Sequence, residues 1–192
     1  MNPFTIDTSD FQFLLDTVGE TVIIDNVPKK CIVQNAKIGD YEDKYIYTLD
    51  SIQRGNLIIL HNEKNYLIIS DVTKGRQYNK ALMRKCTHKI RVMIQEGEKI
   101  LIGTTPWGEE IYETTDPVYD DFPCIVEQEK IVIEGSQIKT SDSEIYVTLA
   151  DNEHTRKIKL NDVYEVAGAQ YKVIHINYTK SGLIILKCET AV

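Results

Sequence analysis

The sequence predicts an all-β protein: two small antiparallel β-barrel or β-sandwich modules related by internal duplication, with a short N-terminal helix. Two observations predict this fold. Short runs rich in Val, Ile, Tyr and Thr recur about every ten residues between turn residues, which is typical of small antiparallel sheets. The octapeptide CIVQNAKI at Cys31–Ile38 also returns 93 residues later as CIVEQEKI at Cys124–Ile131.

The segment TSDFQFLLDTVG near the N-terminus predicts the helix. Its apolar residues stand at i, i+3, i+4 and i+7, which places one stripe on a helix of about three turns: Phe11, Leu14, Leu15 and Val18. Polar residues 8–10 can cap the start of this helix, and Gly19 can end it. We therefore expect the stripe to face a core.

Three hairpins are predicted after the helix. The loop His61–Asn65 joins two apolar strands, the turn Ala167–Gly168 joins two more, and a third hairpin turns at Glu96–Gly97. The stretch 104–123, TTPWGEEIYETTDPVYDDFP, is the least regular part of the chain. It predicts a long loop or arm between the two halves.

The match between the halves extends beyond the octapeptide. The segment IYTLD at Ile46–Asp50 recurs as YVTLAD at Tyr146–Asp151. A drifting offset is expected when loops change length while strands keep their alternation. We therefore predict two domains: residues 1–95 with the helix and the first β module, and residues 96–192 with the connecting hairpin, the acidic arm and the second β module.

The cysteines predict core positions rather than chemistry. The chain has four of them and no CxxC pair: Cys31, Cys86, Cys124 and Cys188. A zinc site needs four converging ligands, and such pairs usually supply two of them, so no metal or cofactor is expected. Cationic neighbours could favour a thiolate at Cys86, but strand alternation puts Lys85 on the opposite face. We expect no enzymatic activity.

The charge is negative overall and unevenly distributed. The formal value of −7 disfavours bulk attraction to nucleic acid or to an anionic membrane. Residues 72–95 nevertheless carry seven Lys or Arg and no acid, whereas residues 102–129 carry eight acids and no Lys or Arg. Opposed blocks of this kind can pair within one molecule or between neighbouring copies.

Each block has two interpretations. The basic residues could hold a nucleic-acid strand in an oligonucleotide-binding fold, with Tyr66 and Tyr78 stacking on bases, or form a solvated or neighbour-facing strand face. The acidic segment could be a surface loop, or it could dock on the next subunit through its aromatic residues. The candidate interface residues are Lys74, Arg76, Lys85, Lys89, Arg91, Trp107, Glu109, Glu110, Tyr112 and Tyr119.

The strand patterns follow an order that resembles a known family. Small structural proteins of tailed phages and prophages of Gram-positive bacteria are similar in these segments: KIGDYEDKYIYTLDSIQRGNLI, NYLIISDV, ALMRKC, FPCIV, IYVTLADNEHTRKIKLNDVYEVAGAQYKVIHI and GLIILKCE. The resemblance runs from about Phe11 to Glu189. It implies a non-enzymatic virion protein of the head–tail connector, neck or head-closure region, assembled in the host cytoplasm.

The resemblance also implies partners. They are identical subunits in a homo-oligomeric ring of about six or twelve copies, portal, adaptor or tail proteins, and DNA that passes through the lumen without specific binding. No membrane is implied, and the sequence has no run of 18 apolar residues and no basic start before an apolar signal core. The alternatives are a phage tail structural protein, a β-barrel nucleic-acid-binding protein, or an enzyme of unrecognised type.

Overall fold

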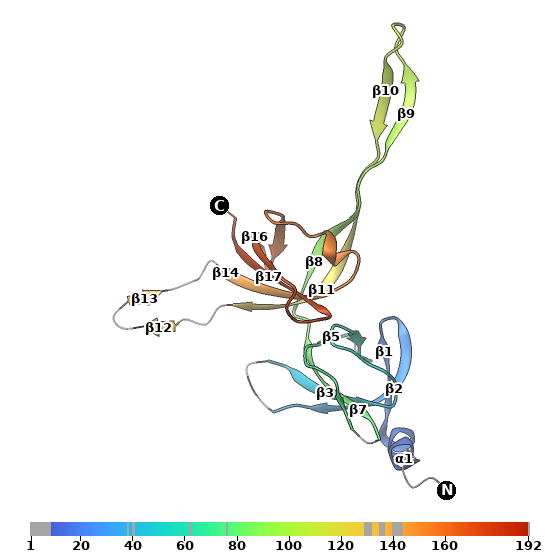
Figure 1. Cartoon of the computed structure of the whole chain (residues 1–192), viewed down its shortest axis with the longest axis vertical. Coiled ribbons are helices and arrows are strands. Elements are labelled where there is room, and N and C mark those ends of the chain that lie inside the picture. Colours follow the sequence, from blue (N-terminus) through green and yellow to red (C-terminus); the bar gives the residue numbers. More distant parts are fainter. Residues whose placement is uncertain are drawn as a thin grey trace.

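The computed structural model confirms the predicted all-β class. It describes residues 9–37, 39, 41–61, 63–75, 77–128, 132–134, 137–139 and 144–191, and only the backbone of 132–134 and 137–139. The strands form a closed barrel and a nearly closed one, which lie one above the other in Figure 1. No helix in the described part of the chain has the length and apolarity to span a bilayer.

Barrel 1 is a ring of six strands with a short seventh strand at its side. Its sheet order is β3-β2-β1-β4-β5-β7-β6, and β3 also pairs with β7 to close the ring. The bounds are β1 Glu20–Ile24, β2 Val27–Asn35, β3 Asp43–Thr48, β4 Leu57–Ile59, β5 Asn65–Ile68, β6 Thr73–Lys74 and β7 Asn79–Lys85. Alternate side chains fill the interior, including Cys31, Ile46, Ile58, Tyr66 and Met83, none of which is exposed.

Barrel 2 has six strands in the order β15-β16-β17-β14-β11-β8. The bounds are β8 His88–Gln95, β11 Val118–Gln128, β14 Glu144–Ala150, β15 Val163–Val166, β16 Ala169–Asn177 and β17 Leu183–Thr190, with a short 3-10 helix η1 at Thr155–Lys157. Its core includes Ile90, Cys124, Leu149, Val173 and Leu186. Two hairpins leave this barrel: β9 Lys99–Thr104 with β10 Glu110–Thr114, and β12 Val132–Glu134 with β13 Gln137–Lys139.

The two barrels follow one path. The ring β1-β2-β3-β7-β5-β4 corresponds strand by strand to β8-β11-β14-β17-β16-β15. Cys31 begins the repeated segment on β2 and Cys124 begins it on β11, and both are fully buried. The same order of pairing and the sequence repeat together indicate duplication.

The registers of the two barrels correct the sequence match by one residue. Ile32 lies opposite Tyr47, and its counterpart Ile125 lies opposite Thr148. Thr48 therefore corresponds to Leu149, although the repeated letters align it with Thr148. Side chains alternate along a strand, so a one-residue slip would turn the core set outward. The structure keeps Thr48 and Leu149 both at 0% exposure.

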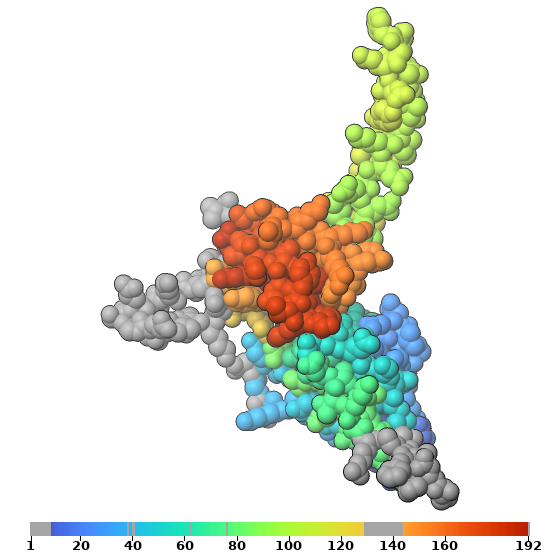
Figure 2. All heavy atoms as spheres, in the orientation of Figure 1, coloured from blue at the N-terminus to red at the C-terminus, as the bar shows by residue number. Residues whose placement is uncertain are grey.

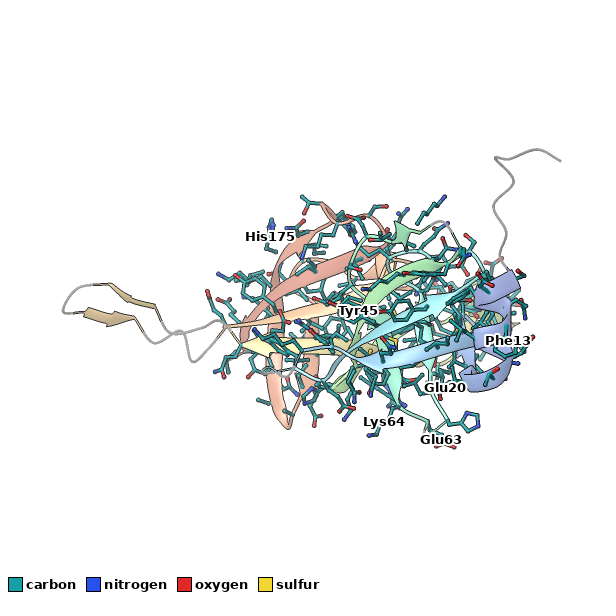
Figure 3. All side chains as sticks on the ribbon, turned by 90° about the horizontal axis from the view of Figure 1, so that it is seen from below. Phe13, Glu20, Tyr45, Glu63, Lys64 and His175 are labelled. Atoms are coloured by element: carbon teal, nitrogen blue, oxygen red, sulfur yellow. The ribbon has the colours of Figure 1, made fainter. Side chains whose placement is uncertain are left out.

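The predicted helix exists, but only half of its apolar stripe packs. Helix α1 covers Ser9–Val18, and Phe11 and Leu15 are buried, with the ring of Phe11 4.9 Å from that of Tyr78. Leu14 and Val18 stay exposed, because the helix lies on the side of barrel 1 with a narrow contact. Figure 3 shows the neighbouring Phe13 on α1 at the edge of the molecule. Gly19 follows the helix as predicted, whereas Thr8 lies outside the described residues.

Two of the three predicted hairpins are confirmed. The loop at His61–Asn65 joins the antiparallel strands β4 and β5, and Ala167–Gly168 joins β15 and β16. The prediction of a hairpin at Glu96–Gly97 is wrong, because β8 pairs with β11 and β9 pairs with β10. The strand after Gly97 leaves the sheet instead of turning back along β8.

Only two residues connect the barrels. The amide of Cys86 donates to the Asn65 carbonyl in barrel 1 at 2.8 Å, and the amide of Thr87 donates to the Cys124 carbonyl in barrel 2 at 3.0 Å. Strand β8, which precedes the domain boundary predicted after residue 95, pairs in barrel 2. The change from one sheet to the other therefore falls between residues 86 and 87.

Side chains and backbones hold the barrels together. Leu67 of barrel 1 packs against Ile125 and Leu183 of barrel 2, and all three are buried. The guanidinium of Arg84 donates to both carboxylate oxygens of Asp43 at 2.8 and 3.0 Å and also pairs with Glu127 across the junction. A linker of two residues and these contacts make the two barrels one unit.

Two glycines allow the backbones of the two barrels to approach closely. Gly55 and Gly182 both have positive φ, at 91° and 83°, and each faces the other's loop. A Cβ on Gly55 would lie 1.9 Å from the Gly182 carbonyl oxygen, and one on Gly182 would lie 2.0 Å from the Arg54 carbonyl oxygen. Because the atoms in contact belong to the backbone, no flexible side chain can move aside to make room for an added Cβ.

A comparison of Gly182→Ala with Gly168→Ala should distinguish the cost of a positive φ from the cost of crowding between the barrels. Both glycines have φ 83°, but a Cβ at Gly168 meets nothing within 4 Å. Gly168→Ala should lower the free energy of unfolding by about 1 kcal/mol, and Gly182→Ala by a further ~2 kcal/mol through overpacking. Chemical denaturation measures both. Equal losses would mean that the barrels do not meet at this point.

Candidate interaction surfaces

The hairpin β9–β10 is an arm that stands clear of both barrels, as Figures 1 and 2 show. Its two strands pair from Lys99 opposite Thr114 to Thr104 opposite Glu110, with one register shift. At its base, the amide of Glu98 donates to the hydroxyl of Thr115 at 2.8 Å, and the amide of Thr115 donates back to the Glu98 carbonyl at 2.9 Å. The arm therefore begins as a fixed extension of β8 and β11.

The tip of the arm is a tight, hydrogen-bonded turn. The amide of Gly108 donates to the Thr105 carbonyl at 2.9 Å, and the amide of Glu109 donates to the Thr105 hydroxyl at 3.0 Å. Gly108 has φ 87°, which closes such a turn without a Cβ penalty. This turn presents Trp107, whose side chain is 89% exposed.

The arm carries apolar side chains that no described part of the chain covers. Besides Trp107, five large apolar residues are between 42% and 58% exposed: Ile100, Leu101, Ile102, Ile111 and Tyr112. An isolated two-stranded hairpin is only marginally stable in water, and a cluster of exposed apolar residues marks an interaction site. Acids flank the cluster at Glu109, Glu110 and Glu113.

The predicted acidic segment is divided between the arm and barrel 2. Trp107, Glu109, Glu110 and Tyr112 lie on the arm, where the Tyr112 hydroxyl donates to Glu110 and this bond raises the pKa of Tyr112. Tyr119 instead lies on β11 opposite Met93, half exposed at the surface of barrel 2. The stretch predicted as one irregular loop or arm is therefore a hairpin followed by a sheet strand.

The predicted basic residues do not form one surface. Lys74 lies on β6 in barrel 1, whereas Lys89 and Arg91 lie on β8 in barrel 2. Lys85 pairs with Glu42 at 2.8 Å, and Arg91 pairs with Asp121 at 3.2 Å. Arg76 is outside the described residues. Much of the basic block thus finds its acids within the same molecule, and Tyr66, one of the two predicted base-stacking residues, is fully buried.

A second surface lies where barrel 2 fails to close. In barrel 1, β1 pairs with β4, with Ile23 opposite Ile59. The corresponding strands β8 and β15 lie side by side, but in the described part of the chain no strand ladder joins them. A groove of about 650 Å³ follows this opening, and we call it the seam groove. One side is lined by residues 91–95 of β8, Glu96 and Tyr119, and the other by residues 156, 157, 159 and 162–164.

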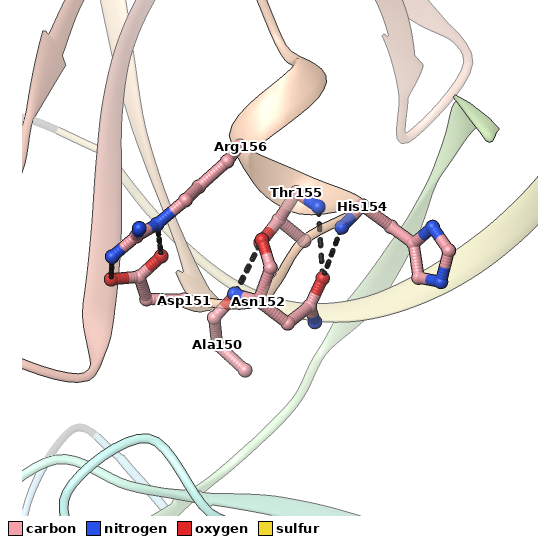
Figure 4. A network of polar contacts seen from close by, with 6 residues as sticks. All are labelled: Ala150, Asp151, Asn152, His154, Thr155 and Arg156. Carbon is pink, nitrogen blue, oxygen red and sulfur yellow. Dashed lines mark hydrogen bonds and ion pairs between the residues drawn. The ribbon is translucent and has the colours of Figure 1, made fainter.

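A network of polar contacts fixes the helix η1 beside the seam groove (Figure 4). The amides of His154 and Thr155 both donate to the Asn152 side-chain oxygen at 2.9 Å. The buried Thr155 hydroxyl donates to the Ala150 carbonyl at 2.7 Å. Arg156 forms two bonds to Asp151, at 2.6 and 2.8 Å. The network places the next residue, Lys157, across the opening.

The cysteines behave as core residues. Cys31, Cys124 and Cys188 are buried and Cys86 is partly buried, and all four thiols are free. Burial raises the pKa of Cys86 to about 12 and that of Cys124 to about 12, which keeps both thiols protonated at neutral pH. Among the described residues, no three His, Cys, Asp or Glu side chains lie close enough together to hold a metal ion.

Comparison with protein families divides the chain within one residue of the point at which the structure changes from one barrel to the other. Residues 2–85 match the YomX N-terminal domain, and residues 86–189 match the YomX C-terminal domain. The chain belongs to the YomX family. YomX proteins are encoded by phages and prophages, so this is a phage-associated protein, and neither match is to a catalytic domain. No curated protein and no solved structure matches the chain significantly.

The residues that the sequence analysis missed lie in the segment EHTRKIK. Arg156, Lys157 and Lys159 stand within four positions of one another and line the seam groove. The density of positive charge in this segment is the sequence signal that could have identified these residues. The sequence contains no such signal for the opening between β8 and β15, because whether two strands pair depends on contacts between residues far apart in the chain.

We expect the Lys85–Glu42 pair to show in the pH dependence of stability. The hydrogen bond from Lys85, helped by one from Tyr66, lowers the pKa of Glu42 to about 2, below the roughly 4.3 of an unfolded chain. The stabilisation is therefore present above about pH 4 and is lost as the pH falls toward 2.

Glu42→Gln should remove this dependence. Its side chain is 43% exposed, so the loss at pH 7 should stay below about 1 kcal/mol. Denaturation series between pH 2 and 7, with Lys85→Met as the matched variant, measure the difference. A gap between Glu42→Gln and the wild type that persisted unchanged at pH 2 would contradict this assignment.

Trp107 is the only tryptophan of the chain, so intrinsic fluorescence reports on the arm tip. We expect the isolated subunit to show the red-shifted emission of a water-exposed indole and ready quenching by acrylamide. A partner that covers the tip should shift the emission to the blue and protect it. Blue-shifted, protected emission from a protein shown by light scattering to be monomeric would mean that the arm folds back on its own chain.

Proposed function

We propose that this protein is a structural subunit of the phage particle, a ring subunit of the head–tail connector or neck, without enzymatic activity. The observation that carries the proposal is the arm with its six uncovered apolar side chains. Membership of a phage-encoded family supports it. Its working surfaces are then contacts between proteins, and its place is the virion, after assembly in the host cytoplasm.

The construction of the chain suits a ring. A projecting arm on one side of a rigid two-barrel unit makes contacts that join two different faces, and such head-to-tail contacts close into rings when the rotation permits. We propose a closed ring of about six or twelve copies. Further partners are the portal, adaptor or tail proteins above and below the ring. The formal charge of −7 lets DNA pass the lumen without specific binding.

Truncation of the tryptophan side chain at the arm tip tests the proposal within the phage. Trp107→Ala removes a side chain that is 89% exposed, so we expect unchanged thermal stability. Because tryptophans at interface centres commonly contribute ~2 kcal/mol or more, we expect at least about tenfold less incorporation into particles and a matching loss of infectivity. Tyr178→Ser, at an exposed aromatic residue on barrel 2, is the matched control and should assemble normally.

The location of the protein can be measured in purified phage particles. Mass spectrometry of purified virions should find the protein in stoichiometric copies, and cryo-electron microscopy should place it in a ring between head and tail. Its absence from purified particles would sink the proposal. Density in the tail tube would replace the neck assignment by a tail one.

A further inference from the structure

The seam groove and the arm have complementary chemistry. The groove is lined by four basic residues, Arg91, Arg156, Lys157 and Lys159, and by two acids, Glu96 and Asp162. Arg91 and Arg156 already pair with Asp121 and Asp151 outside the lining, so the cations offered to a partner are Lys157 and Lys159. Exposed apolar side chains of Met93 and Val163 lie among them. The arm has the reverse composition, with Glu109, Glu110 and Glu113 around its apolar cluster and Lys99 near its base.

The groove also has the hydrogen-bonding character of a strand acceptor. The strands β8 and β15 flank it without pairing to each other in the described part of the chain, so each has an edge directed toward the groove. Lys157 donates its ammonium group to the Ile94 carbonyl there, a carbonyl that a neighbouring strand would otherwise use. An added strand can complete such an edge through its backbone while its side chains give specificity.

The arm offers the matching edge. Its two strands pair only with each other in the described structure, so both outer edges are free of sheet partners. Strand β10 has five residues and extends about 17 Å, which is enough to run along the four residues of β15. The acids lie on β10 and at the turn before it, so β10 is the strand whose charge fits the groove.

The occupant has to come from another molecule. The arm leaves barrel 2 after the end of β8 and extends away from the barrel (Figures 1 and 2). Glu96, which follows β8, lines the chain's own seam groove. The bonds between Glu98 and Thr115 hold that direction at the base. An arm fixed in this way reaches forward to a neighbour and does not fold back over its own barrel.

We propose that the seam groove between β8 and β15 is the receptor for the arm of a second copy of this chain. Strand β10 lies along the opening with Glu110 and Glu113 near Lys157 and Lys159, and the apolar side chains of the arm cover Met93 and Val163. The contact joins two different surfaces, so it repeats from subunit to subunit. It rests on the proposed function, because it supplies the contact by which the ring subunits join.

Cysteine cross-linking in the particle tests the contact directly. Phage carrying both Glu110→Cys and Lys159→Cys should give, on mild oxidation, a ladder of covalent oligomers up to the closed ring. Cys31, Cys124 and Cys188 are buried and can stay in place. The pair Glu110→Cys with Thr73→Cys, an exposed position on β6 of barrel 1, is the matched control and should give no ladder.

Charge reversal provides a second test with its own rescue. Glu110→Lys with Glu113→Lys should lower incorporation at least about tenfold, because like charges placed together in an interface cost several kcal/mol. Adding Lys157→Glu with Lys159→Glu in the same chain should restore incorporation. Adding Lys74→Glu with Lys89→Glu changes the net charge equally at other surfaces and should not restore it.

The outcomes separate the two proposals. Particles that contain the protein but give no ladder, with no rescue by the groove reversal, would overturn the seam groove as receptor and leave the virion assignment standing. A ladder formed by the purified protein, together with its absence from virions, would support the contact and overturn the neck assignment. Circular dichroism and thermal melting of each variant identify any that fails to fold.

Discussion

Backbone hydrogen bonding at strand edges is the constraint on which this structure depends. Every strand has two edges, and a sheet closed into a ring satisfies all of them without help from outside. Barrel 1 reaches that state through the ladder between β1 and β4. The Asp25 carboxylate reinforces it by accepting the Leu57 amide at 2.8 Å and the side-chain amide of Asn56. Barrel 2 follows the same path, and β8 and β15 end it without that last ladder.

The two-residue linker and the packing between the barrels hold barrel 1 against barrel 2. Thr87 and Cys86 each bond to a different barrel, Arg84 joins Asp43 to Glu127, and Gly55 meets Gly182 backbone to backbone. The junction therefore fixes the position of barrel 1 beside barrel 2, which carries both the arm and the seam groove. Surfaces held in fixed relation on rigid elements lose less entropy when they bind.

The sequence predicted those features that depend on neighbouring residues. The alternation of apolar residues gave the strands, the turn residues gave the hairpins at His61–Asn65 and Ala167–Gly168, and the octapeptide located equivalent strands. Features set by distant contacts were less accessible. The segment around Glu96–Gly97 has an ordinary hairpin sequence, yet β8 pairs with β11 and not with the strand that follows it. Likewise, the letters TL at 48–49 and 148–149 match while the structural register is shifted by one residue.

The connection between the first two strands of each barrel shows what duplication made possible. In barrel 1 it is the two-residue turn Asp25–Asn26, with both residues at positive φ, and Asp25 also secures the neighbouring strand β4. In barrel 2 the same connection has grown into the arm, and the position after β8 is Glu96, which lines the seam groove. Two copies of one strand order therefore end differently: in barrel 1 the short turn accompanies a closed ring, and in barrel 2 a protruding hairpin at the same place accompanies an open edge.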